Sequence, residues 1–243
     1  MPADWIVPDW PAPARVQALS TLRSGGFSQP PWDSFNLGDH VEDNPDLVAR
    51  NRARLVADAH LPAEPLWMEQ IHGCEVLTDG DHGSRGDARF SSQPKEICVV
   101  MTADCLPVLL CDMQGTAVAA VHAGWRGLAG GVLEQALRCF DQPASAIMVW
   151  LGPAIGPSVF EVGDEVRGLF MQQQTRSESA FQPHAQGKWL VDIYELARQH
   201  LYVQGVEQVY GGGFCTYTDS ERFFSYRRDG RTGRMASLIW LEE

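Results

Sequence analysis

Short apolar runs bounded by glycine, proline, asparagine and aspartate recur along the chain and predict a protein built mainly from β-strands. Three residues separate the run at 97–102 from the run at 106–111, and five more separate that run from 117–122. Because such spacings are too short for a crossover helix, these strands are expected to pair antiparallel. The runs that predict strands are Val16–Leu22, Leu66–His72, Ile97–Thr102, Leu106–Cys111, Ala117–His122, Ile147–Leu151, Val206–Tyr210, Phe223–Arg227 and Met235–Trp240.

Helical periodicity appears in three segments between these runs. The first helix begins at Asn44, a favourable N-cap residue that is followed by proline. The second covers 126–140, where an apolar stripe continues through three glycines. The third begins at the capping box of Asp192 and Glu195. Together, the elements predict an α+β fold: a layered α/β sandwich with mixed, largely antiparallel sheets and outer helices.

The composition of the chain limits its domain organisation and the kinds of partner that it could bind. No internal repeat, long linker or composition shift divides the 243 residues, so we expect one domain spanning 1–243. The net charge of −12 argues against nucleic acid or an anionic membrane as partner. No apolar run approaches the ~20 residues of a membrane span, and the first ten residues lack the basic start of a signal peptide. The six cysteines form no C-x-x-C pair, which indicates free thiols and a cytoplasmic protein.

Two segments combine the residue types of a metal or nucleophile site: Thr102-Ala103-Asp104-Cys105 and His122-Ala123-Gly124-Trp125-Arg126-Gly127. Cysteine and histidine are zinc ligands, and a catalytic zinc site uses three protein ligands with an open fourth position. His72 ranks first as the third ligand because it ends an apolar run before a glycine, and His40 ranks second. Taken singly, each such residue is more often part of the scaffold. The other histidines lie near helix ends or in polar loops: His60, His82, His184 and His200.

Three arginines could hold an anion. Arg126 lies at the start of the second helix, where free N–H groups and the helix dipole attract negative charge. In a strand, Arg227 and Arg228 would point to opposite faces, so at most one would enter a shared pocket. Arg23 precedes a Ser-Gly-Gly turn. For each arginine, the ordinary alternative is a solvated or salt-bridged surface side chain.

Seven short motifs together resemble the YfiH family of laccase-domain proteins, whose members are variously called polyphenol oxidases, purine nucleoside phosphorylases and peptidoglycan editing factors. The likeness runs from about residue 5 to 241, and the motifs at 102–107 and 122–127 are its most specific parts. The motifs are Thr21-Leu22-Arg23-Ser24-Gly25-Gly26, Ser34-Phe35-Asn36-Leu37-Gly38, Glu69-Gln70-Ile71-His72-Gly73, Thr102-Ala103-Asp104-Cys105-Leu106-Pro107, His122-Ala123-Gly124-Trp125-Arg126-Gly127, Leu151-Gly152-Pro153-Ala154-Ile155-Gly156 and Phe224-Ser225-Tyr226-Arg227-Arg228-Asp229.

The resemblance implies a zinc centre formed by His72, Cys105 and His122, and a fold like that of cytotoxic-necrotising-factor-type cysteine hydrolases. It implies phosphorolysis of adenosine, inosine and methylthioadenosine, together with deamination of adenosine. We therefore expect a monomer that acts on a purine nucleoside and phosphate. Asp104 is the candidate for proton transfer or for support of the Cys105 ligand. The candidates for binding substrate or phosphate are Arg23, Asn36, Arg126 and Arg228.

Three alternatives stay open on the sequence. Cys105 as nucleophile with His122 as base would make a hydrolase of an amide such as a cell-wall precursor. A copper-dependent polyphenol oxidase is chemically possible because a His₂Cys set also binds copper. Seven histidines with no His-x-His pair exclude the full copper set of a laccase. A non-catalytic metal-binding or partner-binding protein would need a closed four-ligand site, and the sequence offers no obvious fourth ligand.

Overall fold

In the computed structural model, which describes residues 5–81 and 85–243, three sheets form the framework. The largest has six strands in the order β11-β7-β5-β6-β3-β2 and is mixed: β5, β6 and β3 pair antiparallel, whereas β11 and β2 pair parallel with their neighbours. Its strands are β2 (Val76–Leu77), β3 (Ala88–Ser91), β5 (Leu106–Asp112), β6 (Val118–Ala123), β7 (Ile147–Leu151) and β11 (Gln208–Gly211).

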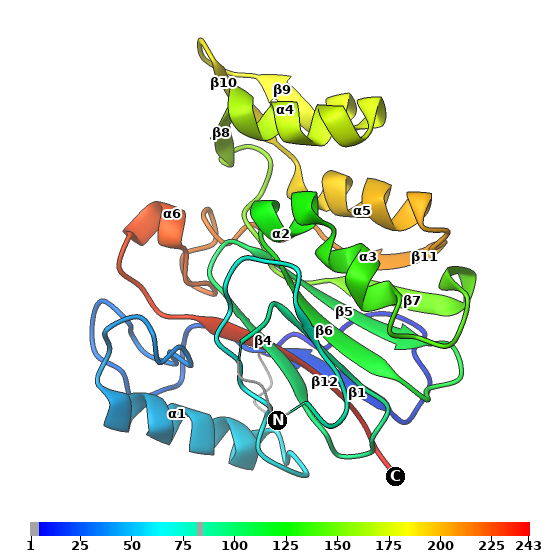
Figure 1. Ribbon diagram of the computed structural model, residues 1–243. Coiled ribbons are helices and arrows are strands. Elements are labelled where there is room, and N and C mark those ends of the chain that lie inside the picture. The colour runs from blue at the N-terminus through cyan, green and yellow to red at the C-terminus, as the bar shows by residue number, and fades with distance from the viewer. Residues whose placement is uncertain (1–4, 82–84) are drawn as a thin grey trace.

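A second, antiparallel sheet packs face to face against the first through a shared apolar layer that includes Val100 and Leu109. Its strands, in spatial order, are β1 (Val16–Ser20), β12 (Met235–Leu241) and β4 (Cys98–Thr102). A third, small sheet lies at one end of the molecule and comprises β8 (Glu161–Gly163), β10 (Lys188–Val191) and β9 (Phe181–Pro183) (Figure 1).

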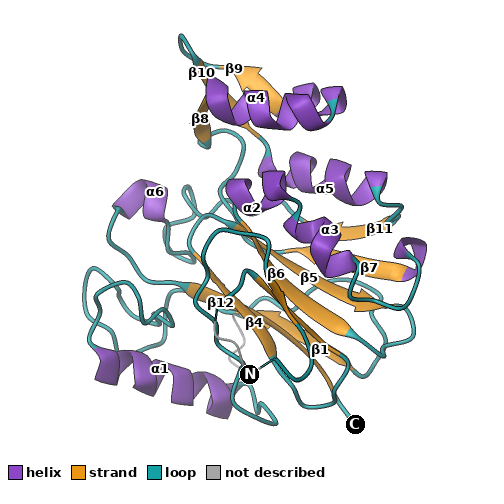
Figure 2. Cartoon of the chain, viewed as in Figure 1, coloured by secondary structure: helices purple, strands orange, loops and turns teal. Residues whose placement is uncertain are grey.

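Helices cover the outer faces of the two large sheets, so the layers run helix, sheet, sheet, helix (Figure 2). One outer layer holds α2 (Trp125–Gly130), α3 (Val132–Leu137) and α5 (Ile193–Val203), and the other holds α1 (Pro45–Asp58). The expected layered sandwich is therefore confirmed. The remaining helical segments are η1 (Ala144–Ala146), α4 (Asp164–Gln173), η2 (Thr175–Ala180) and α6 (Tyr226–Asp229).

Local chemistry explains where the helices begin and end. Asn44 accepts a hydrogen bond from the Asp46 N–H at 2.9 Å at the start of α1, and Asp192 accepts one from the Glu195 N–H at 3.0 Å at the start of α5. The predicted helix over 126–140 divides at Gly131. Its φ of +94° is a left-handed conformation that ends α2 before α3 begins.

Two of the predicted strands are wrong. Leu66–His72 makes only isolated bridges, because the Gln70 side chain takes the place of a backbone partner. Its amide accepts from the Met101 N–H at 2.7 Å and donates to the Met101 carbonyl at 2.9 Å. Phe223–Arg227 instead leads into the short helix α6, capped by Ser225. Consequently, Arg227 and the arginine after it do not lie on opposite faces of a strand.

The sequence pattern does not predict several short elements: β2, β3, the whole third sheet and α4.

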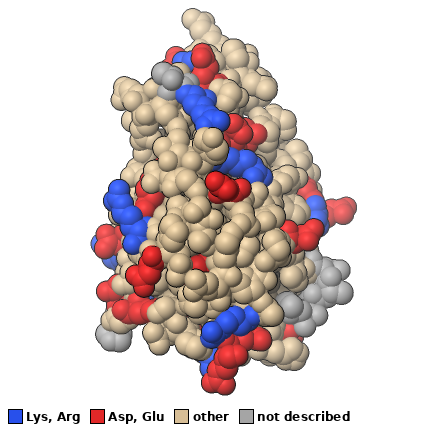
Figure 3. Space-filling model, turned by 90° about the vertical axis from the view of Figure 1, so that its right-hand side faces the viewer, with Lys and Arg blue, Asp and Glu red and all other residues tan. Residues whose placement is uncertain are grey.

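All six cysteines are free thiols, as expected. Within the described ranges, no helix combines the length and apolar character needed to cross a membrane. On the described part of the face in Figure 3, Lys and Arg side chains lie in separate small groups near acidic ones, rather than in a continuous basic stripe.

Candidate metal centre

The structure brings His72, Cys105 and His122 together, with their ligand atoms all within 4.8 Å of one another. Of residues 5–81 and 85–243, these form the single group of three or more side chains with metal-ligand spacing. Pairing of β5 with β6 sets Pro107 opposite His122, so the turn before β5 delivers Cys105 beside the end of β6. His72 comes from the loop before β2, and its ring lies edge-on to that of His122, with centroids 4.8 Å apart.

Asp87 holds two of these ligands in place, and sequence reasoning missed it. Its fully buried carboxylate accepts hydrogen bonds from His122 Nδ1 at 2.8 Å, from the His72 N–H at 2.9 Å and from the Gly73 N–H at 2.6 Å. Burial alone would raise the pKa of Asp87, but these hydrogen bonds lower it. Because Asp87 engages Nδ1, the Nε2 atom of His122 is left to face the site.

The signal that could have found Asp87 is the register of β3 on β6. Ala88 pairs with Val121, which places Asp87 across from His122, and the His122 N–H donates to the Asp87 carbonyl at 2.7 Å. The sequence shows only that the segment around Asp87 is rich in glycine, serine and aspartate. No residue spacing within it separates Asp87 from its neighbours.

Gly124 leaves the space that a bound ion would need. A Cβ at this position would lie 3.0 Å from Cys105 Sγ, 3.4 Å from His72 Cδ2 and 3.7 Å from His122 Nε2. Any larger residue would therefore intrude among the three ligands. Two imidazoles and a thiolate form a donor set that suits Zn²⁺ with an open fourth position, and the same set suits copper. The residues present fit a metal ion.

The charges and hydrogen bonds around Cys105 favour its thiolate form. Burial alone would raise the pKa of Cys105, but the charge of His122 and hydrogen bonds from both histidines lower it to about 6. Burial likewise works against a charged His122, yet the Cys105 thiolate and the Asp87 hydrogen bond raise its pKa to about 9. With these pKa values, the metal-free pair at neutral pH is a thiolate beside an imidazolium. Metal binding would therefore displace a proton from His122.

The three ligands line a cavity of about 410 Å³, a size typical of small-molecule sites. Its other walls come from β4, from the segment before β12 and from α6. His40, the second-ranked ligand candidate, lines this cavity without joining the cluster. Burial, followed by the charge of Arg234, lowers the pKa of His40. The remaining lining residues are Gln70, Met101, Thr102, Ala103, Tyr226 and Arg234.

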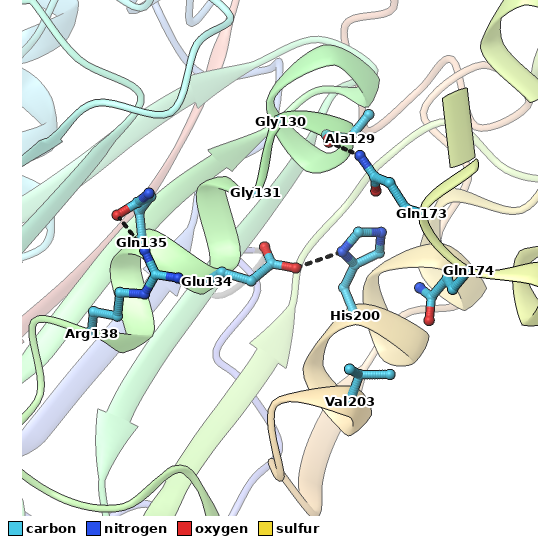
Figure 4. A pocket seen from close by; sticks show the side chains of 10 residues that line it. All are labelled: Ala129, Gly130, Gly131, Glu134, Gln135, Arg138, Gln173, Gln174, His200 and Val203. Carbon is cyan, nitrogen blue, oxygen red and sulfur yellow. Dashed lines mark hydrogen bonds and ion pairs between the residues drawn. The ribbon is translucent and has the colours of Figure 1, made fainter. Parts of the chain in front are cut away.

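The other candidate ligands lie elsewhere. His200 pairs with Glu134 in a separate pocket of about 430 Å³ between α3 and α5 (Figure 4). His184 is half-exposed near Glu161, and His60 is an exposed residue just after α1. His82 lies outside the described residues.

Asp104 supports the turn that carries Cys105. Asp104 has a φ of +96°, and both its carboxylate oxygens are engaged: Oδ1 by the Thr216 hydroxyl at 2.6 Å and Oδ2 by the Arg227 N–H at 2.7 Å. Of the two roles considered for Asp104, this geometry favours support of the ligand over proton transfer.

The four residues expected to bind substrate or phosphate do not line the metal cavity. Arg23 and Arg228 line a different hollow, where they lie 3.6 Å from Asp33 and 2.8 Å from Asp229. Arg228 also donates to three backbone carbonyls, a role in local structure.

Arg126 and Asn36 are also outside the cavity. The Arg126 guanidinium lies 4.3 Å from the ring centre of Trp125 and is exposed. Asn36 is fully buried and binds the Gly38 carbonyl and Asp43, while its Oδ1 accepts from the Arg234 N–H at 2.9 Å. Asn36 is therefore linked to the cavity lining by its hydrogen bond with the backbone of Arg234.

The chain is similar to known proteins over nearly its whole length. The family model for multi-copper polyphenol oxidoreductase laccase matches residues 17–242. The chain is 57% identical over 239 residues to the purine nucleoside phosphorylase YfiH of Escherichia coli (strain K12), covering 97% of this chain and 98% of the relative. It is 54% identical over 241 residues to a purine nucleoside phosphorylase of Pseudomonas aeruginosa, covering 98% and 99%.

Solved structures share the fold over nearly the full length. A crystal structure of a Neisseria meningitidis protein superposes with a TM-score of 0.95 at 49% identity, covering 98% of this chain and 99% of that one. The crystal structure of YlmD from Geobacillus stearothermophilus gives a TM-score of 0.87 at 30% identity, covering 98% and 96%.

Proposed function

The chain belongs to the multi-copper polyphenol oxidoreductase laccase family, and from that premise we propose that it is a zinc-dependent purine nucleoside phosphorylase. Its substrates would be adenosine, inosine and methylthioadenosine, with inorganic phosphate as co-substrate. One observation carries the proposal: His72, Cys105 and His122 converge in a single cavity of a chain 57% identical to a relative named for this activity.

The chain's own residues have defined tasks in this proposal. His72, Cys105 and His122 would hold the ion, and Asp87 would keep the Nε2 atom of His122 directed at it. Asp104 would hold the Cys105 turn in place. When bound, zinc supplies a Lewis acid that polarises an oxygen atom in its open position. The surrounding cavity of about 410 Å³ provides room for a nucleoside.

A second function, hydrolysis of an amide, rests on the Cys105–His122 pair. With a pKa of about 6, Cys105 is a thiolate at neutral pH beside a protonated His122. Its sulfur would attack the carbonyl carbon, and the C–N bond would break as His122 gives its proton to the leaving amine. Water would then hydrolyse the thioester. This chemistry requires the thiolate to be free of metal.

Metal removal separates the two functions. Zinc-loaded and chelator-treated protein would be assayed with adenosine, inosine and methylthioadenosine, each with and without phosphate. We expect free base to be released only when both zinc and phosphate are present. Ammonia release from adenosine tests an accompanying deaminase activity in the same preparation. Failure to release base from any nucleoside would overturn the phosphorylase, and amide cleavage that survives chelation would favour the thiol mechanism.

A further inference from the structure

Among the described residues, Arg234 is the one arginine that lines the metal cavity. It immediately precedes β12, and the β12–β4 pairing sets Met235 opposite Thr102, so Arg234 lies beside the turn that carries Cys105. Its Nη1 atom donates to the carbonyls of Thr232 and Gly233, both at 3.0 Å. Among the described residues, the Nε and Nη2 atoms have no hydrogen-bond partner.

Arg234 has no ion-pair partner in the part of the chain that the structure describes, and the Asp104 carboxylate acts on it only from a greater distance. Among the described residues, no Asp or Glu oxygen lies within ion-pair distance of its guanidinium, whereas Arg52, which contacts Met101 of the cavity lining, lies 3.3 Å from Asp39. Removing an unpaired guanidinium from water is unfavourable, and burial accordingly lowers the pKa of Arg234. The negative group that most opposes this shift is the Cys105 thiolate. A cation held in this way suits an anionic ligand.

Neighbouring residues also fix the position of the Arg234 backbone and leave space for its side chain. Asn36 accepts from its backbone N–H at 2.9 Å, and a Cβ on Gly38 would lie 2.8 Å from its Cγ. The Asn36 and Gly38 positions of the Ser34–Gly38 motif therefore fix the backbone of Arg234 and leave space for its aliphatic stem. This accounts for a motif that the three metal ligands leave unexplained.

We propose that Arg234 binds the phosphate co-substrate through its free Nε and Nη2 atoms, an inference that rests on the phosphorylase function proposed above. A planar guanidinium presents two parallel N–H donors that match two phosphate oxygens. A third phosphate oxygen then attacks the ribose C1′ as the C1′–N bond breaks. The electron pair leaves with the purine, which takes up a proton, and ribose 1-phosphate is formed.

The Arg234→Gln and Arg234→Lys variants test this subsite in the zinc-loaded protein. We expect Arg234→Gln to weaken the binding of inorganic phosphate, measured by titration calorimetry, and to raise KM for phosphate by roughly 10- to 100-fold, while KM for inosine changes less than about twofold. Arg234→Lys keeps the positive charge but lacks the two parallel N–H donors, so its effect on phosphate binding should be intermediate. Arg54→Gln, which breaks a surface ion pair with Asp58 on α1, is the matched control.

The outcomes distinguish this inference from the function on which it rests. An unchanged phosphate affinity and KM in both Arg234 variants would overturn the subsite while leaving the phosphorylase intact. The same would follow if only Arg126→Gln raised KM for phosphate. A third outcome is that wild-type protein binds phosphate, Arg234→Gln does not, and neither protein releases base. That result would support the phosphate subsite and contradict the phosphorylase function. Melting temperatures show whether Arg234→Gln is still folded. If it is not, the phosphate affinity and the KM for phosphate of Arg234→Lys decide between these outcomes.

Discussion

Two buried histidines, His122 at the end of β6 and His200 on α5, each pair with a carboxylate in nearly the same local geometry. His122 Nδ1 lies 2.8 Å from Asp87, and His200 Nδ1 lies 2.7 Å from Glu134. The two histidines are 3% and 5% exposed, so both rings are shielded from water to the same degree. A carboxylate that orients a histidine ring is therefore not sufficient to mark a metal site.

The difference lies at the other ring nitrogen. That of His122 faces Cys105 and His72 within 4.8 Å, whereas Nε2 of His200 is buried without a hydrogen-bond partner among the described residues. The pocket around His200 is lined by glutamines, glycines and aliphatic residues and by one arginine (Figure 4). In that pocket the His200–Glu134 hydrogen bond links α5 to α3. At the candidate metal centre, by contrast, Cys105 and His72 lie beside His122 and complete a set of three side chains that could hold a metal ion.

The largest expected effect is that of Cys105→Ala, because it removes one of three ligands. We expect this variant to stay folded, to lose most bound zinc and to lose activity on every substrate together. Zinc content by atomic emission and a thermal melt would check this. Cys139→Ala is the matched control, since Cys139 is a half-buried thiol that does not belong to the cluster. Normal zinc and normal turnover in Cys105→Ala would mean that the site is misplaced.

Asp87→Asn is expected to lower zinc affinity by roughly 10- to 100-fold, since it weakens the orientation of His122 and the support of His72. The measurement is a competition titration with a fluorescent zinc chelator. Glu134→Gln, the same change at the pair with His200, should leave zinc affinity unaltered. Equal losses in the two variants would contradict the distinction between the two pairs.

Glu134→Gln should produce the smallest effect, a decrease in melting temperature of roughly 2–4 °C at pH 7, for a loss of about 1 kcal/mol. Burial alone would raise the pKa of Glu134, but the hydrogen bond from His200 lowers it. Stability from a depressed carboxylate pKa is present above the unfolded value of about 4.3 and is lost as the pH falls through the folded value. Melts of both proteins from pH 7 to 3 should therefore converge at the acid end. A constant difference would show that the charge contributes nothing.

The sequence predicted the parts of the site that depend on local pattern. Cys105 and His122 sit at the ends of strongly apolar strands, and the structure confirms both strands and brings the two side chains together. Asp87 and Arg234 were missed because each reaches the site through strand register, of β3 on β6 and of β12 on β4. Asp87 and His122 are 35 residues apart, and β12 and β4 are further apart still, so no local spacing in the chain reveals either register.

For the fold, too, the sequence predicted the parts that depend on local pattern. The helices at α1 and α5 carry their capping residues in the sequence, and the structure confirms them. Leu66–His72 has the apolar content of a strand, but the Gln70 side chain, rather than the backbone, makes the contact with β4. A side chain that substitutes for strand pairing has no signature in hydrophobic periodicity.

X-ray absorption at the zinc edge of the zinc-loaded protein tests the central claim most directly. We expect one sulfur at about 2.3 Å and two imidazole nitrogens at about 2.0–2.1 Å, from Cys105, His122 and His72, with one further light atom that exchanges with solvent. In Asp87→Asn the same three protein ligands should remain at lower occupancy. A first shell without sulfur, or one closed by four protein ligands, would contradict the account.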